Sequence, residues 1–542
     1  MSPTLHVLSE GDLRRWRTCA RLQWLHRAAL RAHEASGPGA AGHSADASRD
    51  GRGQRVAGPA EPDVVFGPEP ALALRASYPE ALSIAPPAAD AGSEADNEAD
   101  WARAIAATTA AMTDPARQAM GAAVLGACVQ SDDGARVRID VLVRGALGWQ
   151  IYKQRLATVA DDADVDALAL WVHVASRAGW RVQSAGLLLV DTGFVYPGMQ
   201  CYAGLFREVD VGPMLGTRPV GEWLAALRGS EAGPKPAPAL GAPCAQGGGC
   251  RFMAECHAGE PGGRVVDPAW QLDIVGKELA AALRREGHVD LRSVPPERLS
   301  DARHRRALRA VRQGAPVLEP GVARLMRELP WPRLHLRMET IGFAVPVWPG
   351  TRPYQVLPFQ WSCDVETAPG QWTHHGFLAD AAGGDPRRAF ALSLLVALNA
   401  HGTQGAILAY NAGFERNRIR ELAQQFDELR EPLEALLPRV VDLFQLARTH
   451  YYHPAMAGSW SAKTVFGLIA PELNVTRLGR READAPLQAF ARSLQRGLPA
   501  AERERLRSAL QAHGQRRTEA LRRMAALFDH AADDAAPHSL TD

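Results

Sequence analysis

Three cysteines with one repeated spacing are the clearest chemical signal in the sequence. Cys244, Cys250 and Cys256 follow a C-x5-C-x5-C pattern within GAPCAQGGGCRFMAECHAG, where Gly and Pro free the backbone to wrap three thiolates around one centre. A fourth ligand must come from elsewhere, and Cys19, in RTCARLQWL, is the natural candidate. Four thiolates satisfy a cubane iron-sulfur cluster or a tetrahedral zinc site, and the spacing does not choose between them. Because C-x5-C is looser than the usual C-x2-C, three thiols without a ligand role are the alternative.

The other cysteines and the start of the chain bear on the compartment. Cys128, Cys201 and Cys363 lie in apolar, strand-like text, and we expect them to be small buried hydrophobes. The first residues, MSPTLHVLSEGDLRRW, lack a basic segment followed by an apolar segment and a cleavage site, so we expect a cytoplasmic protein. Cysteines there bind metals more often than they form disulfides. No apolar run approaches the ~18 residues that cross a bilayer, so no membrane is expected as a partner.

Length and charge limit the possible functions. A chain of 542 residues predicts on the order of two to four domains. The formal net charge of +1 gives no global attraction for nucleic acid, so any such binding needs a local patch. Between Lys277 and Arg312 there are ten Lys and Arg against five Asp and Glu. We expect nucleic-acid contacts from the following arginines, with an ordinary solvated face as the alternative: Arg303, Arg305, Arg306, Arg309 and Arg312.

The sequence of the first half of the chain predicts a mixed β-sheet with helices packed on it. Ser9 followed by Asp12 predicts a capping box that opens a helix running to about Ala32, with Cys19 inside it. Alternation over 122–153, broken by SDDG and GALG, predicts a three-stranded meander with Asp140 on its middle strand. A helix at 165–178 and a strand at 186–190 follow. We therefore expect these parts: a helix at 1–35 that carries the first cysteine, a flexible linker at 36–62, and a module at 63–262 closed by the cysteine triplet.

The second half predicts a different order of elements. A basic helical connector is expected at 263–329, and a second α/β domain at 330–542. Strands are predicted near 334–338, 356–364 and 372–378, followed by a helix that Asp385-Pro386 opens and that ends near Asn399. A strand at 404–410 and two further helices complete the order of RNase H-like domains. The charge-rich helical tail, 499–529, is expected to be a solvated face.

Five stretches of the sequence are specific: LSEGDLRRWRTCARLQWL at the start, the cysteine triplet, PGTRPYQVLPFQWS at 349–362, AYNAGFE at 409–415 and HYYHPAMAGSWSAK at 450–463. Through them nearly the whole chain is similar to a bacterial family of unknown function, which joins an iron-sulfur PD-(D/E)XK nuclease-like module to a DnaQ-like exonuclease-like domain. The first module also resembles the nuclease part of AddAB helicase-nucleases and the CRISPR-adaptation exonucleases. The resemblance implies a restriction-endonuclease-like module with a four-Cys staple, followed by an RNase H-like fold. It also favours a 4Fe-4S cluster over zinc at the four cysteines.

The resemblance further implies which carboxylates the first module needs. Two-metal phosphodiester cleavage requires clustered carboxylates that hold Mg²⁺ or Mn²⁺. Asp140 stands at the first such position, but WQIYKQR places Lys153 and Arg155 where Glu and Lys are expected. Leu170 or a neighbour replaces the glutamine of the following helix. A solvated or salt-bridged strand residue is the alternative for Asp140.

The exonuclease-like domain has lost acids in the same way. In HLRMET, Glu339 is present but Arg337 stands at the Asp position, while YNAGFE supplies an intact Glu415. In AHGQRRTEALRRM, His513 falls at the Tyr position and Arg517 at the Asp position. Two of the four acids remain, and arginine in place of an acid repels a divalent metal ion.

Other acids could stand in for the missing ones. DVET imitates the first exonuclease motif with Asp364 and Glu366, but its flanking sequence resembles the family's second strand, so we favour RMET. Asp442, in RVVDL, is a further acid whose alternative role is a helix or loop cap. We expect a catalytically degenerate nuclease-family protein that binds nucleic acid or a partner that processes it. The alternatives are a Mg- or Mn-dependent 3'-to-5' exonuclease that uses these displaced acids, and a structural or protein-interaction role.

Overall fold

The computed structural model describes most of the chain and divides it into two compact units. The described residues are 7–35, 70–87, 94–117, 119–237, 250, 252, 270–380, 383–473, 486–495 and 497–531, so the expected linker at 36–62 lies outside them. The first unit comprises Met1–Pro261 and Phe343–Gln355, and the second comprises Gly262–Gly342 and Val356–Asp542. Both are mixed α/β structures. Among the described helices, none is both long and apolar enough to cross a membrane.

The first unit is built on a six-stranded sheet in the order β1-β2-β3-β4-β5-β6. The predicted meander is confirmed, because β2, β3 and β4 pair antiparallel, and β5 then pairs parallel to β4 after the α5 crossover. The strands are β1 (Leu82–Ser83), β2 (Ala123–Gln130), β3 (Arg136–Arg144), β4 (Trp149–Arg155), β5 (Val182–Val190) and β6 (Phe206–Asp210). The helices are α1 (Glu10–Thr18), α2 (Ala20–Ala35), α3 (Pro70–Ser77), α4 (Glu94–Thr113), α5 (Asp162–Arg177), α6 (Gly212–Leu215) and α7 (Val220–Ala232).

The predicted N-terminal helix is broken in two at Cys19. The capping box of Ser9 and Asp12 is present, but Cys19 has extended backbone angles, φ −167° and ψ 117°, so the expectation of a single helix was wrong. The break allows α2 to turn back against α1 and α7. The buried side chain of Gln23 then donates from Nε2 to Asp12 Oδ1 at 2.9 Å and to Glu231 Oε1 at 2.7 Å. These contacts define the direction in which α2 leaves Cys19.

A loop from the second half of the chain belongs to the first unit. Residues 343–355 form a loop whose two ends lie together, because the amide of Tyr354 donates to the carbonyl of Phe343 at 2.7 Å. Its Val345 packs into one apolar cluster with Tyr196 and Tyr202, whose rings are stacked at 4.8 Å. The stretch PGTRPYQVLPFQWS is therefore only partly a strand, since β9 begins at Leu357.

The second unit is built on a five-stranded sheet in the order β10-β9-β8-β11-β12. β8, β9 and β10 pair antiparallel, and β11 and β12 are added in parallel on the other side of β8. The predicted strands are thus present: β8 (Arg333–Ile341), β9 (Leu357–Ala368), β10 (Gln371–Leu378), β11 (Ala406–Ala409) and β12 (Val440–Asp442). β7 (Val317–Leu318) pairs with β13 (Tyr451–Tyr452) in a separate ribbon.

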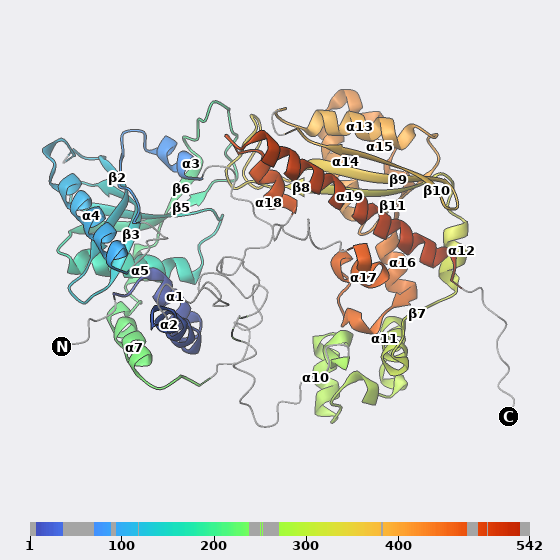
Figure 1. Cartoon of the computed structure of the whole chain (residues 1–542), viewed down its shortest axis with the longest axis horizontal. Coiled ribbons are helices and arrows are strands. Elements are labelled where there is room, and N and C mark those ends of the chain that lie inside the picture. The colour runs from blue at the N-terminus through green and yellow to red at the C-terminus, as the bar shows by residue number, and fades with distance from the viewer. Residues whose placement is uncertain are drawn as a thin grey trace. The chain divides into compact units, whose positions relative to one another are not determined.

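The two faces of this sheet differ in chemistry. Leu334, Leu336 and Met338 of β8 point to an apolar core with α13 (Arg387–Asn399), α14 (Gly413–Gln425) and α15 (Arg430–Glu434). The alternate residues of β8 are polar and face α19 (Ala500–Asp529), which crosses the opposite face of the sheet in Figure 1. The tail was expected to be a solvated face. Instead, one side of α19 is buried, because it covers this polar sheet face.

The basic stretch expected to be a connector shares a core with the rest of the second unit. Leu283 and Ala310 pack in one cluster with Leu443, Phe466 and the end of α19. The helices involved are α10 (Lys277–Arg285), α11 (Ala302–Gln313), α12 (Gly321–Arg327), α16 (Leu443–His450) and α17 (Ala462–Ile469), while α18 (Pro486–Ser493) packs on α19.

Candidate functional site

Helix α19 follows strand β9 in matched steps across the polar face of the sheet. A Cβ atom on Gly514 would clash with Ser362 Oγ, so helix and strand are in close approach there. Four residues further on, Thr518 Oγ1 donates to Asp364 Oδ1 at 3.2 Å. Four helical residues rise about 6 Å, and two strand residues about 6.6 Å, so the steps stay in register. The match places the side chain of Arg517, between these contacts, over β8.

Two arginines and two glutamates meet where α19 crosses the end of β8. Arg517 Nη1 lies 2.7 Å from Glu339 Oε1, and Arg337 Nη1 lies 3.3 Å from Glu415 Oε1. Arg337 also donates to the carbonyl of Tyr410 at 3.1 Å. We call Arg337, Glu339, Glu415 and Arg517 the Arg–Glu quartet. Its formal charges cancel.

Short-range structure explains how each member of the quartet is placed. Arg337 and Glu339 are two residues apart on β8 and so share one face. Glu415 lies in the first turn of α14, directly after β11, which runs parallel to β8. Arg517 comes from α19. The structure therefore brings Arg517 against Glu339, two residues that the sequence motifs singled out separately.

Burial shifts the ionisation of the quartet. The Glu415 side chain is fully buried, and this burial raises its pKa to about 7 although Arg337 acts in the opposite direction. Burial also lowers the pKa of Arg517 from its ordinary value, against the attraction of Glu339. Each ion of the quartet therefore depends on its partner for charge compensation.

The acids proposed as substitutes lie elsewhere. Asp364 pairs across the strands with His335, two positions from Arg337, and His374 Nδ1 lies 2.7 Å from its Oδ1. Glu366 lies one further step away, where its Oε2 is 3.1 Å from His335 Nε2. Both are thus bound within the sheet and α19 layer, away from Glu415.

Asp442 has the structural role that was given as its alternative. Its Oδ1 accepts hydrogen bonds from the amides of Phe444 and Asn411, both at 3.0 Å, so it caps α16. Within the described ranges, no group of three or more His, Cys, Asp or Glu side chains could hold a metal ion.

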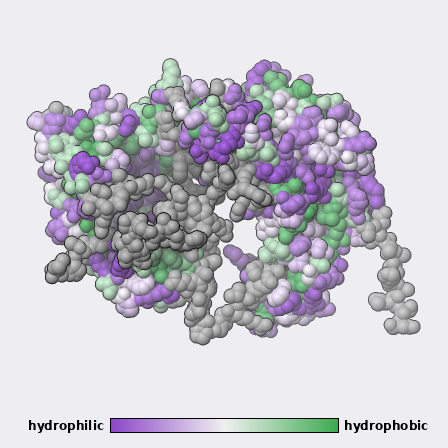
Figure 2. Space-filling model, in the orientation of Figure 1, coloured by the Kyte–Doolittle hydropathy of each residue, from purple (hydrophilic) through white to green (hydrophobic). Residues whose placement is uncertain are grey.

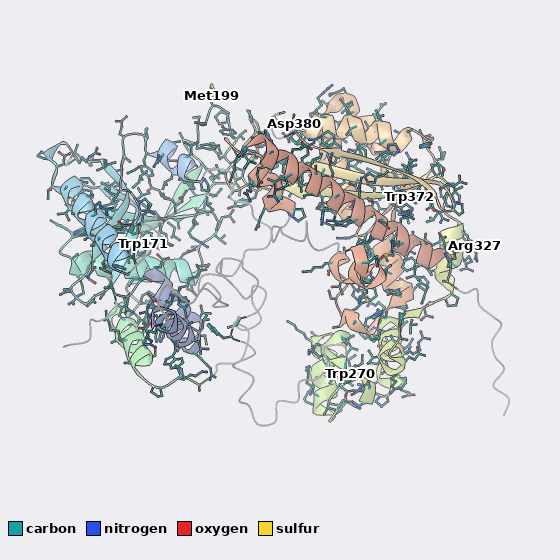
Figure 3. All side chains as sticks on the ribbon, viewed as in Figure 1. Trp171, Met199, Trp270, Arg327, Trp372 and Asp380 are labelled. Carbon is teal, nitrogen blue, oxygen red and sulfur yellow. The ribbon has the colours of Figure 1, made fainter. Side chains whose placement is uncertain are left out.

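The candidate site of the first unit also pairs a cation with a carboxylate. Asp140 on β3 accepts from the amide of Gln154 at 2.9 Å, and burial raises its pKa against the attraction of Lys153. Lys153 Nζ lies 2.8 Å from Glu10 Oε1, and Glu10 Oε2 accepts from Trp171 Nε1, also at 2.8 Å. The ammonium lies 4.6 Å from the centre of the Trp171 ring, which Figure 3 labels.

Sequence reasoning missed Glu10. It lies in the first turn of α1, far along the chain from β4, and no local pattern distinguishes it from an ordinary helix-start acid. Arg155, which the resemblance puts at a motif position, pairs through its Nε with Asp164 Oδ1 at 2.6 Å. Leu170 is buried in the core, so it offers no polar group at the position of the missing glutamine.

The structure describes only two of the four cysteines of the proposed site. Cys19 and Cys250 are half-buried, whereas Cys244 and Cys256 lie outside the described residues. The chain that leaves α7 runs along α2: Trp24 Nε1 donates to the carbonyl of Gly233 at 3.3 Å, and Arg21 Nη1 donates to that of Pro236 at 3.2 Å. The segment leading to the triplet therefore returns to the helix that follows Cys19. This arrangement fits a fourth thiolate from Cys19.

The remaining cysteines differ from one another. Cys128 and Cys363 are buried as expected, and burial raises the pKa of Cys128 to about 11. Cys201 is exposed, so the expectation was wrong for this residue. It lies in a loop between β5 and β6 instead of a strand.

The arginines of the basic stretch are engaged within the unit. Arg306 is 4% exposed, and its guanidinium contacts Glu319 and the carbonyls of Arg448 and Thr449. A phosphate cannot reach it there, so its expected contact with nucleic acid is corrected to a structural role. The others have these partners: Arg303 pairs with Asp301, Arg309 with Glu319, Arg305 with the carbonyls of Leu299 and Ser300, and Arg312 with those of Arg292 and Val294.

Comparison with known proteins gives one family match. The family model described as "Domain of unknown function (DUF2779)" matches residues 334–461. The match includes Arg337, Glu339 and Glu415 and ends before α19, which supplies Arg517. No curated protein and no solved structure matches the chain.

Proposed function

We propose that this chain is a nuclease-fold protein that has lost metal-dependent cleavage and that binds nucleic acid, or a protein that processes nucleic acid. The observation that carries the proposal is the Arg–Glu quartet, in which two guanidinium groups take the places where the resemblance implies metal-binding acids. Binding without cleavage is the function that such a site permits.

Strand order supports the two fold types behind the proposal. In the second unit the central β8 is flanked by β9 and β10 on one side and by β11 and β12 on the other, as in RNase H-like domains. In the first unit an antiparallel meander, a helix and a parallel strand follow one another, with Asp140 on the second strand of the meander, as the PD-(D/E)XK resemblance implies.

Electrostatics supports the loss of cleavage. A divalent cation placed about 4 Å from a guanidinium is repelled by on the order of several kcal/mol at the effective dielectric of a protein. In the quartet each carboxylate is already paired with an arginine, so the net negative charge that two metal ions need does not remain. Lys153 has the corresponding place beside Glu10 in the first unit.

The cysteine quartet completes the proposal as a structural staple. We propose that Cys19, Cys244, Cys250 and Cys256 bind an iron-sulfur cluster, of the 4Fe-4S type by resemblance, with zinc as the alternative metal. When bound, such a cluster would link the α1–α2 break to the chain beyond α7. The return of that chain to α2 supports this assignment.

A cleavage assay on the full chain tests the proposal. Labelled single- and double-stranded DNA and RNA are incubated with purified protein and Mn²⁺, and binding of the same substrates is measured in EDTA. We expect binding that weakens with salt and no degradation. Metal-dependent degradation that disappears in Glu415→Ala would overturn the proposal and favour the exonuclease alternative. Absence of binding to every nucleic acid would favour the protein-interaction alternative.

A further inference from the structure

Two tryptophans stand out on the surface of the second unit. Trp331, just before β8, is 37% exposed, and Trp372, on β10, is 42% exposed. Across the part of the chain that the structure describes, they are the only exposed Trp, Tyr or Phe side chains. Indole rings bury a large apolar area when they are covered, so leaving two of them in water needs an explanation.

Each exposed ring is held by an arginine. The guanidinium of Arg522 lies 4.2 Å from the centre of the Trp372 ring, and that of Arg333 lies 4.4 Å from the centre of the Trp331 ring. Arg333 is itself fixed by Asp529 at 2.6 Å, and Arg522 lies 3.5 Å from Asp364. The rings are therefore restrained on one side, and their exposed area remains available to a flat, stacking ligand.

Both rings lie at the same end of the sheet. Arg333 of β8 and Trp372 of β10 are cross-strand partners of the same residue, Glu366 of β9. On α19, the residues that contact the two pairs are Arg522 and Asp529, which are separated by about 10 Å of helix rise. The Arg–Glu quartet lies toward the other end of β8, where Glu339 pairs with Gln360.

Not every arginine near the rings is paired with an acid. Helix α12 packs against α19 and carries Arg324 and Arg327, and Figure 3 places Arg327 and Trp372 toward the end of the unit at which α19 finishes. The side chain of Arg324 is exposed and has no hydrogen-bond or ion-pair partner among the described residues. Asp364 and Asp529 are each already paired with an arginine. Hydrophilic residues predominate along the line of α19 in Figure 2.

We propose that Trp331 and Trp372, with Arg324, Arg327 and Arg522, form a binding surface for the unpaired bases of single-stranded nucleic acid. The inference rests on the proposed function and specifies its ligand. Aromatic rings stack with any base, and nearby cations attract the phosphates. A duplex offers no free base faces to the rings, so single strands are the ligand that this surface selects.

Fluorescence anisotropy with labelled single strands tests the surface in the full-length protein. Binding of an oligothymidine and of a mixed-sequence single strand is measured in EDTA for wild type, Trp331→Leu and Trp372→Leu. Removing one stacking ring should weaken binding by roughly 5- to 100-fold, and Trp372→Phe should restore much of the affinity. The matched control is Val396→Ala, which changes an exposed apolar side chain on α13 of the same unit and should leave affinity unchanged.

The outcomes separate this inference from the proposed function. If wild type binds single strands and both Trp→Leu variants bind equally well, the surface is refuted while nucleic-acid binding stands. If wild type binds no nucleic acid, or binds duplex as tightly as single strand with no dependence on the two rings, the inference fails as well. If wild type degrades the strands with Mn²⁺ but the Trp→Leu variants bind more weakly in EDTA, the surface stands and the loss of cleavage is refuted.

Discussion

Arg517 of α19 contacts Glu339 of β8 at 2.7 Å, across 178 positions of the chain. The two side chains are 19% and 13% exposed, so this ion pair is largely withdrawn from water. It joins α19 to β8.

Removal of Arg517 should destabilise the second unit. In Arg517→Ala, Glu339 would keep its burial and lose its partner, which costs up to about 3 kcal/mol of unfolding free energy. Urea unfolding followed by circular dichroism measures the loss. Arg505→Ala is the control on the same helix, because it removes an exposed pair with Glu502 that contributes less than about 1 kcal/mol. Equal effects of the two substitutions would contradict the structural role of Arg517.

Reversal of both arginines should create affinity for metal ions. The double substitution Arg337→Asp and Arg517→Asp would gather four carboxylates with Glu339 and Glu415, which is the ligand type that Mn²⁺ prefers. We expect Mn²⁺ binding by electron paramagnetic resonance in the double variant and none at this site in wild type. A folded double variant that binds no Mn²⁺ would show that the quartet does not occupy a former metal site.

The raised pKa of Glu415 should make stability depend on pH. Burial raises this pKa from 4.5 to about 7, so between these values the unfolded chain has lost a proton that the folded chain keeps. The free energy of unfolding should therefore fall as pH rises from about 4.5 to about 7, by at most on the order of 3 kcal/mol. Glu415→Gln cannot ionise and should lack this part of the slope. Urea unfolding of both proteins is measured at several pH values in this interval. If the free energy of unfolding had the same pH dependence in both, Glu415 would not be its cause.

A side chain at position 514 should push α19 away from the sheet. The missing Cβ of Gly514 is what allows the approach to Ser362, so Gly514→Ala should cost about 1–3 kcal/mol through overpacking. Gly467→Ala is the matched control, since it lies inside α17 with no atom near its absent Cβ and should be neutral or slightly stabilising. Thermal unfolding of the two variants gives the comparison, and a stabilised Gly514→Ala would rule out the close approach.

Cys19 should be required for the visible absorption of the protein when it is purified without oxygen. If the four proposed cysteines bind an iron-sulfur cluster, Cys19→Ser should lower iron content and visible absorption, because one thiolate ligand is lost. Cys201→Ser, which removes an exposed thiol outside the proposed set, should leave both unchanged. Stoichiometric zinc in a colourless wild-type protein would show that the cysteines bind zinc instead of an iron-sulfur cluster.

Local patterns in the sequence were sufficient for much of this protein. The capping box at Ser9, the meander over 122–153 and the strands from β8 to β11 follow from short-range periodicity and turn chemistry, which act within a few residues. The motif resemblance also singled out Arg337 and Arg517, which the structure brings together in the Arg–Glu quartet. The break at Cys19 was not, because the contacts that hold α2 come from Asp12 and Glu231, on two other helices.

Only the tertiary structure decided what those charges do. Arg517 contacts Glu339 because α19 stays in register with β9, and Glu10 pairs with Lys153 from the first helix. Arg306 is buried, although the basic composition of residues 277–312 predicted an exposed side chain. The loop 343–355 likewise packs in the first unit, although both its neighbouring strands belong to the second. Such pairings join residues far apart in the chain, and their energy depends on burial that no local pattern encodes.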